Sequence, residues 1–243
     1  MKIRIKREKN GNKDIQEFDV KDNQTLLNAL IQIKEDQDNT LAFRCGCKSG
    51  VCGSCAVRVN STERLACKTY IKDNDLIEPL NNSSVCKDLI IDLEYEQKKL
   101  KKTATYLHKK SDEKISMEDQ KKIDIQSNCI LCQSCYSSCP VFEVNKDFLG
   151  PYALTRALRY IDDKKEADKI SIIDQIQNNG IWDCTLCGNC TIVCPQFIDP
   201  KSDIMNLRMK SVQNGYEDKS LNMFNNDFNS DINSFTGFDP NGF

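Results

Sequence analysis

The same pattern of four cysteines occurs twice in this chain of 243 residues. Within each pattern two residues separate neighbouring members of the first three cysteines, three residues precede the fourth, and a proline follows at once. The positions are Cys129, Cys132, Cys135 and Cys139 before Pro140, and Cys184, Cys187, Cys190 and Cys194 before Pro195. Three cysteines this close on a tight turn can direct their sulfurs at one point, so the pattern predicts two sulfur-rich metal centres.

This spacing is the one found in bacterial ferredoxins with two 4Fe-4S clusters, where the fourth cysteine of each run ligates the other cluster. The predicted ligand sets are therefore crossed. They are Cys129, Cys132, Cys135 and Cys194 for the first cluster, and Cys139, Cys184, Cys187 and Cys190 for the second. Because each cluster would join two distant segments, we expect metal binding and folding to be inseparable here.

A third cysteine motif lies nearer the N-terminus. It consists of three cysteines spaced C-x4-C-x2-C and a more distant fourth, namely Cys47, Cys52, Cys55 and Cys67. This is the plant-type spacing of a 2Fe-2S cluster, and we predict these four residues as its ligands. Gly46, Gly50 and Gly53 let the backbone wrap closely around such a cluster.

Two of the 14 cysteines remain outside these motifs. Cys45 competes as a ligand, but only Cys47 has the correct spacing to Cys52, so we predict that Cys45 does not ligate iron. Cys86 precedes an apolar, strand-like run, which predicts a buried thiol that acts as a small hydrophobic residue.

Zinc and disulfides explain the cysteines less well. Structural zinc usually takes pairs of C-x-x-C or Cys/His ligands, whereas this chain has two ferredoxin runs. Structural disulfides need an oxidising compartment. Met1 opens a charged strand rather than an apolar signal segment, so we expect neither a signal peptide nor disulfides.

The composition excludes several other classes. Charged residues make up 29% of the chain, and no apolar run approaches the ~18 residues that span a bilayer. The net charge of -2 arises from mixed acids and bases, so we expect no nucleic-acid partner. His108 is the only histidine, and its lysine-rich flanks predict a solvated linker side chain; Rieske ligation and most histidine-based catalysis are excluded.

The predicted fold is of the α+β class, with an N-terminal β-grasp ferredoxin domain and a C-terminal all-α ferredoxin domain. Alternating residues predict a hairpin before residue 20, and apolar residues at helical spacing after Thr25 predict a helix. Pro151 and Pro200 predict the first turns of two later helices. The predicted division is a sheet domain at 1–93, a charged connector at 94–122, a helical domain at 123–215 and a disordered tail at 216–243.

The order of these motifs resembles the iron-sulfur subunit of the succinate dehydrogenase and fumarate reductase family. The stretches that carry the resemblance are residues 43–55 (FRCGCKSGVCGSC), 65–70 (LACKTY), 129–140 (CILCQSCYSSCP) and 190–200 (CTIVCPQFIDP). The resemblance covers about residues 1 to 215. It implies an electron relay between the FAD of a flavoprotein subunit, which holds the succinate/fumarate site, and a membrane quinone or equivalent carrier. It also implies that the 2Fe-2S cluster lies nearest the flavin and the Cys139 cluster nearest the membrane.

The chain departs from most of this family at two places. Most members have an apolar residue where Cys187 stands and hold a 3Fe-4S cluster; the complete quartet here predicts 4Fe-4S, with 3Fe-4S as the alternative. The usual quinone-side Trp and His are replaced by the segment 142–144 and by Thr185. These features resemble the E-type branch, which implies a cysteine-rich, membrane-associated partner. Because we expect no signal peptide, we predict a peripheral position on the cytoplasmic face of the membrane, with export in complex with a signal-bearing flavoprotein as the alternative.

Three alternatives remain open. A thiol-linked fumarate reductase subunit is similar but usually carries a fused C-terminal cysteine-rich domain, and that extension is absent from this sequence. A free multi-cluster ferredoxin would be a monomer that reduces diverse acceptors. An iron-sulfur redox sensor would need a DNA-binding helix pair, which is not visible. The same relay serves both succinate oxidation and fumarate reduction.

Overall fold

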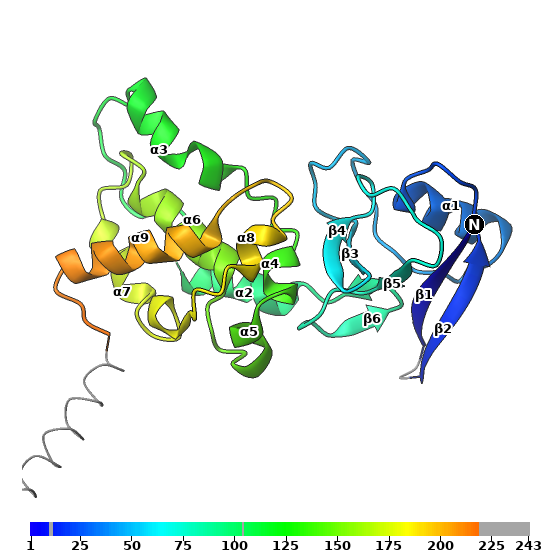
Figure 1. Ribbon diagram of the computed structural model, residues 1–243. Coiled ribbons are helices and arrows are strands. Elements are labelled where there is room, and N and C mark those ends of the chain that lie inside the picture. The colour runs from blue at the N-terminus through cyan, green and yellow to red at the C-terminus, as the bar shows by residue number, and fades with distance from the viewer. Residues whose placement is uncertain (10–11, 104, 219–243) are drawn as a thin grey trace, which may run out of the picture.

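The computed structural model describes residues 1–9, 12–103 and 105–218, and it consists of two lobes. The N-terminal half of the chain forms a strand-rich lobe and the C-terminal half forms a helical lobe (Figure 1). The predicted α+β class is confirmed. The tail predicted to be disordered lies, beyond residue 218, outside the described residues.

The strand-rich lobe contains a five-stranded mixed sheet, a two-stranded ladder and one helix. The sheet order is β2-β1-β5-β3-β4, with β1 and β5 parallel and the other neighbours antiparallel. β6 and β7 pair separately. The elements are β1 (Lys2–Lys9), β2 (Asn12–Asp19), α1 (Leu26–Asp36), β3 (Ala56–Val59), β4 (Thr62–Leu65), β5 (Leu76–Glu78), β6 (Val85–Lys87) and β7 (Ile90–Ile91).

The predicted hairpin and helix are both present because their patterns select them. Ile3 and Ile5 alternate with charged residues along β1 and are fully buried. The Thr25 hydroxyl caps α1 by accepting a hydrogen bond from the N–H of Asn28. The helix packs Leu30 and Ile33 into the core under the sheet. This packed core is the rigid support for the cysteine loop that follows the helix.

The second half of the chain is helical. Its elements are α2 (Glu94–Lys102), α3 (Met117–Ser127), α4 (Ser134–Ser137), α5 (Pro140–Val144), α6 (Pro151–Ile161), α7 (Lys169–Gln175), the short 3-10 helix η1 (Ile181–Asp183), α8 (Asn189–Ile192) and α9 (Pro200–Gln213). The two predicted proline starts are confirmed, since Pro151 and Pro200 open α6 and α9. Asp199 caps α9 by accepting from the N–H of Ser202. α6 and α9 pack against each other in the centre of the lobe (Figure 1).

The charged connector is more ordered than its composition indicates. α2 lies within it, and the predicted boundary between residues 122 and 123 falls inside α3. Lys99 is only 1% exposed, and its Nζ donates to the carbonyl of Lys146 at 2.6 Å. His108 is half-buried and stacks on Tyr106 with ring centroids 4.5 Å apart, so the prediction of a solvated side chain was wrong. Segments of the connector therefore pack on the helical lobe.

None of the described helices is both long and apolar enough to cross a lipid bilayer.

Candidate metal centres

The first centre is built by the loop that leads into β3. The sulfur of Cys47 accepts from the backbone N–H groups of Ser49, Val51 and Cys52 at 3.3 to 3.4 Å. The N–H of Cys47 in turn donates to the sulfur of Cys52 at 3.4 Å. The loop therefore turns its amides toward sulfur, as a bound 2Fe-2S cluster requires.

The four thiols of this loop have unequal environments. Hydrogen bonds from the Ser49 side chain and from backbone N–H groups lower the pKa of Cys47 to about 5, which favours the thiolate that binds iron. Burial, together with the charges of Cys67 and Cys52, raises the pKa of Cys55 to about 12. Cys47 and Cys52 are exposed, whereas Cys55 and Cys67 are buried against the sheet. One edge of this centre therefore reaches the protein surface.

The two ferredoxin runs have the same local geometry. In each, the second residue after the first cysteine has a positive φ, 52° at Leu131 and 55° at Leu186. In each run the third cysteine lies in a short helix, and the residue just before that helix has a left-handed backbone conformation. These residues are Gln133 before α4 and Gly188 before α8. These turns curl the chain so that successive cysteines face inward. α4 and α8 lie against each other (Figure 1).

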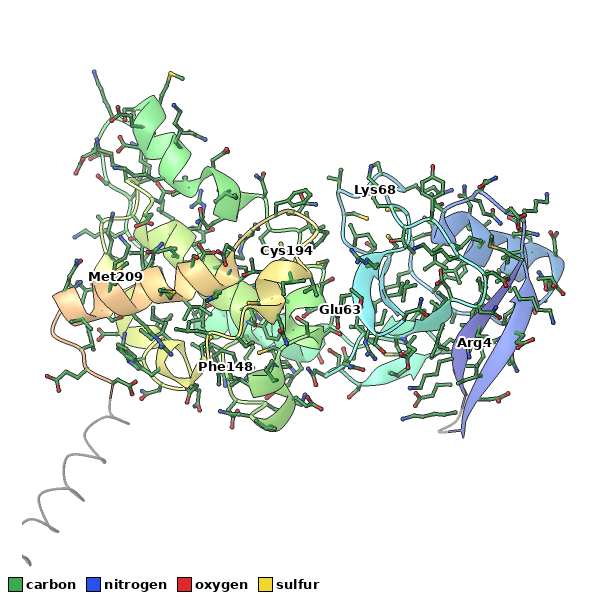
Figure 2. All side chains as sticks on the ribbon, viewed as in Figure 1. Arg4, Glu63, Lys68, Phe148, Cys194 and Met209 are labelled. Atoms are coloured by element: carbon green, nitrogen blue, oxygen red, sulfur yellow. The ribbon has the colours of Figure 1, made fainter. Side chains whose placement is uncertain are left out.

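The predicted ligands of the first four-iron cluster line one apolar cavity. These are Cys129, Cys132, Cys135 and Cys194. Burial and the neighbouring thiols raise the pKa of Cys129 to about 11, and burial raises the pKa of Cys135 further. Cys194 reaches the cavity from a segment far away in the sequence, just before α9 (Figure 2).

The predicted ligands of the second four-iron cluster line another cavity. These are Cys139, Cys184, Cys187 and Cys190. Burial, with the charges of Cys184, Cys139 and Cys187, raises the pKa of Cys190 to about 12. The sulfur of Cys139 accepts from the N–H of Phe142, and that of Cys184 accepts from the N–H of Leu186, both at 3.4 Å. Cys187 is exposed, so this cavity opens at the surface.

The three centres form a row. The loop residue Gly53 has a φ of +72°, and a Cβ placed there would lie 2.8 Å from the Cβ of Cys132. Cys52 and Cys132 line the same pocket at the lobe boundary. Cys135 in turn lies close enough to Cys190 for their charges to interact. The first four-iron centre therefore lies between the 2Fe-2S loop and the second four-iron centre.

The donor set fits clusters rather than single ions. Within the described residues, no three Cys, His, Asp or Glu side chains converge closely enough to hold one metal ion. A cluster differs because its thiolates bind different iron atoms, one thiolate per iron in 4Fe-4S and two per iron in 2Fe-2S, so the sulfurs lie further apart than around a single ion. Buried thiols with raised pKa values do not ionise readily alone, and iron supplies the positive charge that stabilises them as thiolates.

The two cysteines outside the motifs are both exposed. The prediction that Cys86 is buried was wrong. Cys86 is the central residue of β6, and its two neighbours in that strand are half-buried while Cys86 faces solvent. The predicted non-ligating role of Cys45 stays a prediction.

Contacts across the lobe boundary were not predicted from the sequence. The buried carboxylate of Glu63 accepts from the hydroxyl of Ser137 at 2.7 Å. The amide of Asn82 donates to the carbonyls of Tyr136, Ser137 and Cys139 at 2.9 to 3.3 Å. Figure 2 shows Glu63 on the side of the sheet lobe that faces the helices. These bonds fix the sheet lobe directly to the segment that carries the first ferredoxin run.

Comparisons with known proteins agree with this geometry. A family model described as a 2Fe-2S iron-sulfur cluster binding domain matches residues 2–98, and one described as a 4Fe-4S dicluster domain matches residues 125–198. A fumarate reductase iron-sulfur subunit from Haemophilus influenzae is 35% identical over 214 residues, which cover 79% of this chain and 84% of that protein. The chain belongs to the fumarate reductase and succinate dehydrogenase iron-sulfur subunit family. The cofactor set of one 2Fe-2S and two 4Fe-4S clusters follows from the two matched domains.

Other relatives of this iron-sulfur subunit differ in length. An uncharacterised iron-sulfur protein from Methanocaldococcus jannaschii is 37% identical over 222 residues, which are 89% of this chain but 45% of that protein. Among solved structures, a chain of the Mycobacterium smegmatis Sdh1 complex has a TM-score of 0.79 at 22% identity, with 89% of this chain and 97% of that chain covered. That likeness supports the fold. The assignment of individual cysteines to clusters stays a prediction.

Proposed function

We propose that this subunit carries single electrons between the FAD of a partner flavoprotein, which holds the succinate/fumarate site, and an acceptor at the membrane. The acceptor is a quinone or a cysteine-rich, membrane-associated subunit. The row of three cysteine centres carries this proposal, because an electron entering at one end of the row can leave at the other. When bound, the clusters supply one-electron redox chemistry, and the protein supplies ligation and position.

The cysteines assigned to each cluster are part of the proposal. Cys47, Cys52, Cys55 and Cys67 would hold the 2Fe-2S cluster. Cys129, Cys132, Cys135 and Cys194 would hold the first 4Fe-4S cluster, and Cys139, Cys184, Cys187 and Cys190 the second. Their shared cavities and mutual charge effects support these sets. The crossed positions of Cys194 and Cys139 support a fold that depends on iron.

Exposed apolar side chains occur near both ends of the row. Val51, 65% exposed, lies in the 2Fe-2S loop beside Cys52. At the other end, Val144 on α5 and Ile192 on α8 are 85% and 79% exposed. Single exposed apolar residues are common on protein surfaces, so the assignment of the two ends rests on the order of the centres and on the family resemblance. We assign the 2Fe-2S end to the flavoprotein and the Cys187 end to the membrane-side acceptor.

The complete second quartet distinguishes the acceptor end. Cys187 lines the second cavity with the other three thiols, which supports a fourth iron at that position. Thr185 lines the same cavity where most family members are expected to place a histidine. These residues support the E-type arrangement.

A peripheral position on the cytoplasmic face of the membrane stays a prediction. Protease protection of this subunit in intact cells and in inverted vesicles tests it.

The test is anaerobic purification of this subunit with its co-purifying chains, followed by addition of succinate. We expect an FAD-containing flavoprotein to co-purify and succinate to bleach the cluster absorbance only when that flavoprotein is present. Purified alone, the subunit should not respond to succinate. A monomer that reduces diverse acceptors with no flavoprotein attached would instead identify a free ferredoxin carrier and contradict the proposal.

A further inference from the structure

A buried carboxyl group lies beside the first four-iron centre, and the relay described above does not use it. Asp203, on the first turn of α9, is 4% exposed. Its Oδ2 accepts from the hydroxyl of Thr155 at 2.8 Å, and its Oδ1 accepts from the amide Nε2 of Gln126 at 2.9 Å. Among the described residues, no cation lies within ion-pair distance of this carboxyl group. Burial without a cation disfavours the ionised form.

The same carboxyl group is separated from the iron site by one side chain. Thr155 lines the cavity of the first four-iron centre, and so does Pro200, three residues before Asp203 on the same helix. In such an apolar region, charges interact strongly because little water screens them. An added electron at this centre would therefore favour the neutral form of Asp203.

The side-chain amide of Gln126 can form a hydrogen bond with the protonated as well as the ionised form of Asp203. The Oε1 of Gln126 is buried and has no hydrogen-bond donor in the described structure. A half-turn rotation of this amide would exchange its two ends, so that Oε1 could accept from a protonated Asp203. The pair can thus satisfy either state of the carboxyl group, with Nε2 donating to the carboxylate or Oε1 accepting from the acid.

We propose that Asp203 takes up one proton from solvent when the first four-iron centre gains one electron, and releases it when that electron moves on. The centre gains one negative charge and the carboxylate gains one positive charge, so the net charge of this region does not change. The proposal rests on the assignment of Cys129, Cys132, Cys135 and Cys194 to this cluster. Asp203 then acts as a positioning residue that tunes the potential rather than as a ligand.

The surrounding charges support this assignment. The carboxylates of Asp199 and Asp162 raise the pKa of Asp203, in addition to the larger effect of burial. Three of the nearby cations have other partners: Arg159 pairs with Asp163, Lys210 pairs with Asp162, and Arg208 donates to backbone carbonyls. Arg156 acts on Cys129 of the first four-iron centre and, in the described structure, forms no ion pair with Asp203. Apart from Asp203 itself, the charged residues on or at the ends of α3, α6, α7, η1 and α9 are Glu118, Asp119, Lys121, Lys122, Asp124, Arg156, Arg159, Asp162, Asp168, Lys169, Asp174, Asp183, Asp199, Lys201, Arg208 and Lys210.

The experiment is an EPR-monitored redox titration of the first four-iron cluster in the whole purified complex, from pH 5.5 to 9. In the wild type, we expect the midpoint potential to fall above pH 6 by up to about 59 mV for each tenfold drop in proton concentration, the one-electron value. Asp203→Asn should remove this slope and have the higher potential at pH 9. Asp162→Asn, which changes a nearby carboxylate paired with Lys210, should keep the slope.

Two further readouts guard against a merely structural effect. Thr155→Val removes a hydrogen-bond donor to the carboxylate, so the sloping region should move to higher pH. Redox difference infrared spectra should show a carboxylic acid band that appears on reduction of the wild type and is missing in Asp203→Asn. A flat potential in the wild type, or an unchanged slope in Asp203→Asn, would overturn the inference while leaving the relay intact. Loss of the 4Fe-4S signals in the wild type would instead contradict the proposed function.

Discussion

At the scale of single residues, the thiols of this chain differ by how they are solvated. Cys47 is held by backbone N–H groups and has a lowered pKa, whereas Cys135 is buried among other thiols and has a raised one. The first favours the thiolate before iron arrives, and the second depends on iron to become a thiolate. We therefore expect the buried four-iron sites, more than the exposed 2Fe-2S loop, to need metal for their structure.

The buried carboxyl group of Asp203 should also make the stability of the folded protein depend on pH. Its pKa is raised from 3.8 to about 6 by burial, so the folded protein favours the neutral acid. The neutral Asp203 carboxyl group therefore contributes its full amount to the free energy of unfolding below pH 3.8, and this contribution is lost as the pH rises through 6. The full loss is about 3 kcal/mol, of which roughly half falls between pH 5 and pH 8. In anaerobic thermal denaturation, the Tm of Asp203→Asn relative to the wild type should rise from pH 5 to pH 8.

The matched control is Asp162→Asn, whose carboxylate is partly exposed and paired with Lys210 at 2.7 Å. Its Tm relative to the wild type should rise much less over the same range, because Asp162 contributes less than burial to the raised pKa of Asp203. A constant or falling Tm difference for Asp203→Asn would show that the Asp203 carboxyl group is already ionised at pH 5.

At the scale of elements, cysteine spacing could be interpreted from the sequence because ligands of one cluster are mostly neighbours in the chain. The N-terminal caps of the helices also depend on neighbouring residues. The side chains of Thr25 before α1 and Asp199 before α9 each accept a hydrogen bond from a backbone N–H three residues later. The bond between Glu63 and Ser137 joins residues 74 positions apart, and no local pattern specifies it. The burial of Asp203 has the same origin, since its two partners come from α3 and α6.

The wrong prediction for Cys86 also arose because burial depends on how distant parts of the chain pack. Cys86 was predicted to be buried from the apolar residues that follow it, but those residues belong to β7 and the loop, and β6 turns Cys86 outward. The glycines of the first loop were predicted to approach the cluster. Gly46 approaches the sulfur of Cys52, where a Cβ would lie at 2.9 Å, and Gly53 also approaches the helical lobe, a contact that the sequence did not predict. The wrapping of these glycines around a cluster stays a prediction.

Gly53 therefore allows a prediction about the lobe boundary. In Gly53→Ala, the new Cβ would lie 2.8 Å from the Cβ of Cys132 and 3.0 Å from the carbonyl oxygen of Ile130, at a φ of +72°. We expect a loss of about 1–3 kcal/mol of stability and slower electron transfer between the 2Fe-2S and first 4Fe-4S centres. Rapid-freeze EPR after a pulse of reductant measures the order and rate of cluster reduction.

The control for this variant is Gly215→Ala, which has a similar φ of +83° but no atom within 4 Å of the new Cβ. It should show the backbone strain without the change in electron-transfer rate. Equal rates in Gly53→Ala and the wild type would contradict a route through the Gly53 contact.

At the scale of the whole molecule, the two lobes combine one cysteine loop and one pair of ferredoxin runs into a single row of centres. The sheet lobe presents its loop to Cys132, and the side chain of Gln196 reaches back to the carbonyl of Gly50 at 3.1 Å. Both ends of the row reach the surface, one at Cys47 and the other at Cys187. This arrangement suits a subunit placed between an electron donor and an electron acceptor.

The most direct test of this account is low-temperature EPR of the anaerobically purified complex, as isolated and during stepwise reduction. We predict one 2Fe-2S signal and two reducible 4Fe-4S centres, with no 3Fe-4S signal in the undamaged wild type. Cys187→Ser should produce an oxidised 3Fe-4S signal, whereas Cys86→Ser, which changes an exposed cysteine outside the motifs, should not. A 3Fe-4S signal at full occupancy in the wild type would show that Cys187 is not a ligand and would contradict the assignment of the second centre.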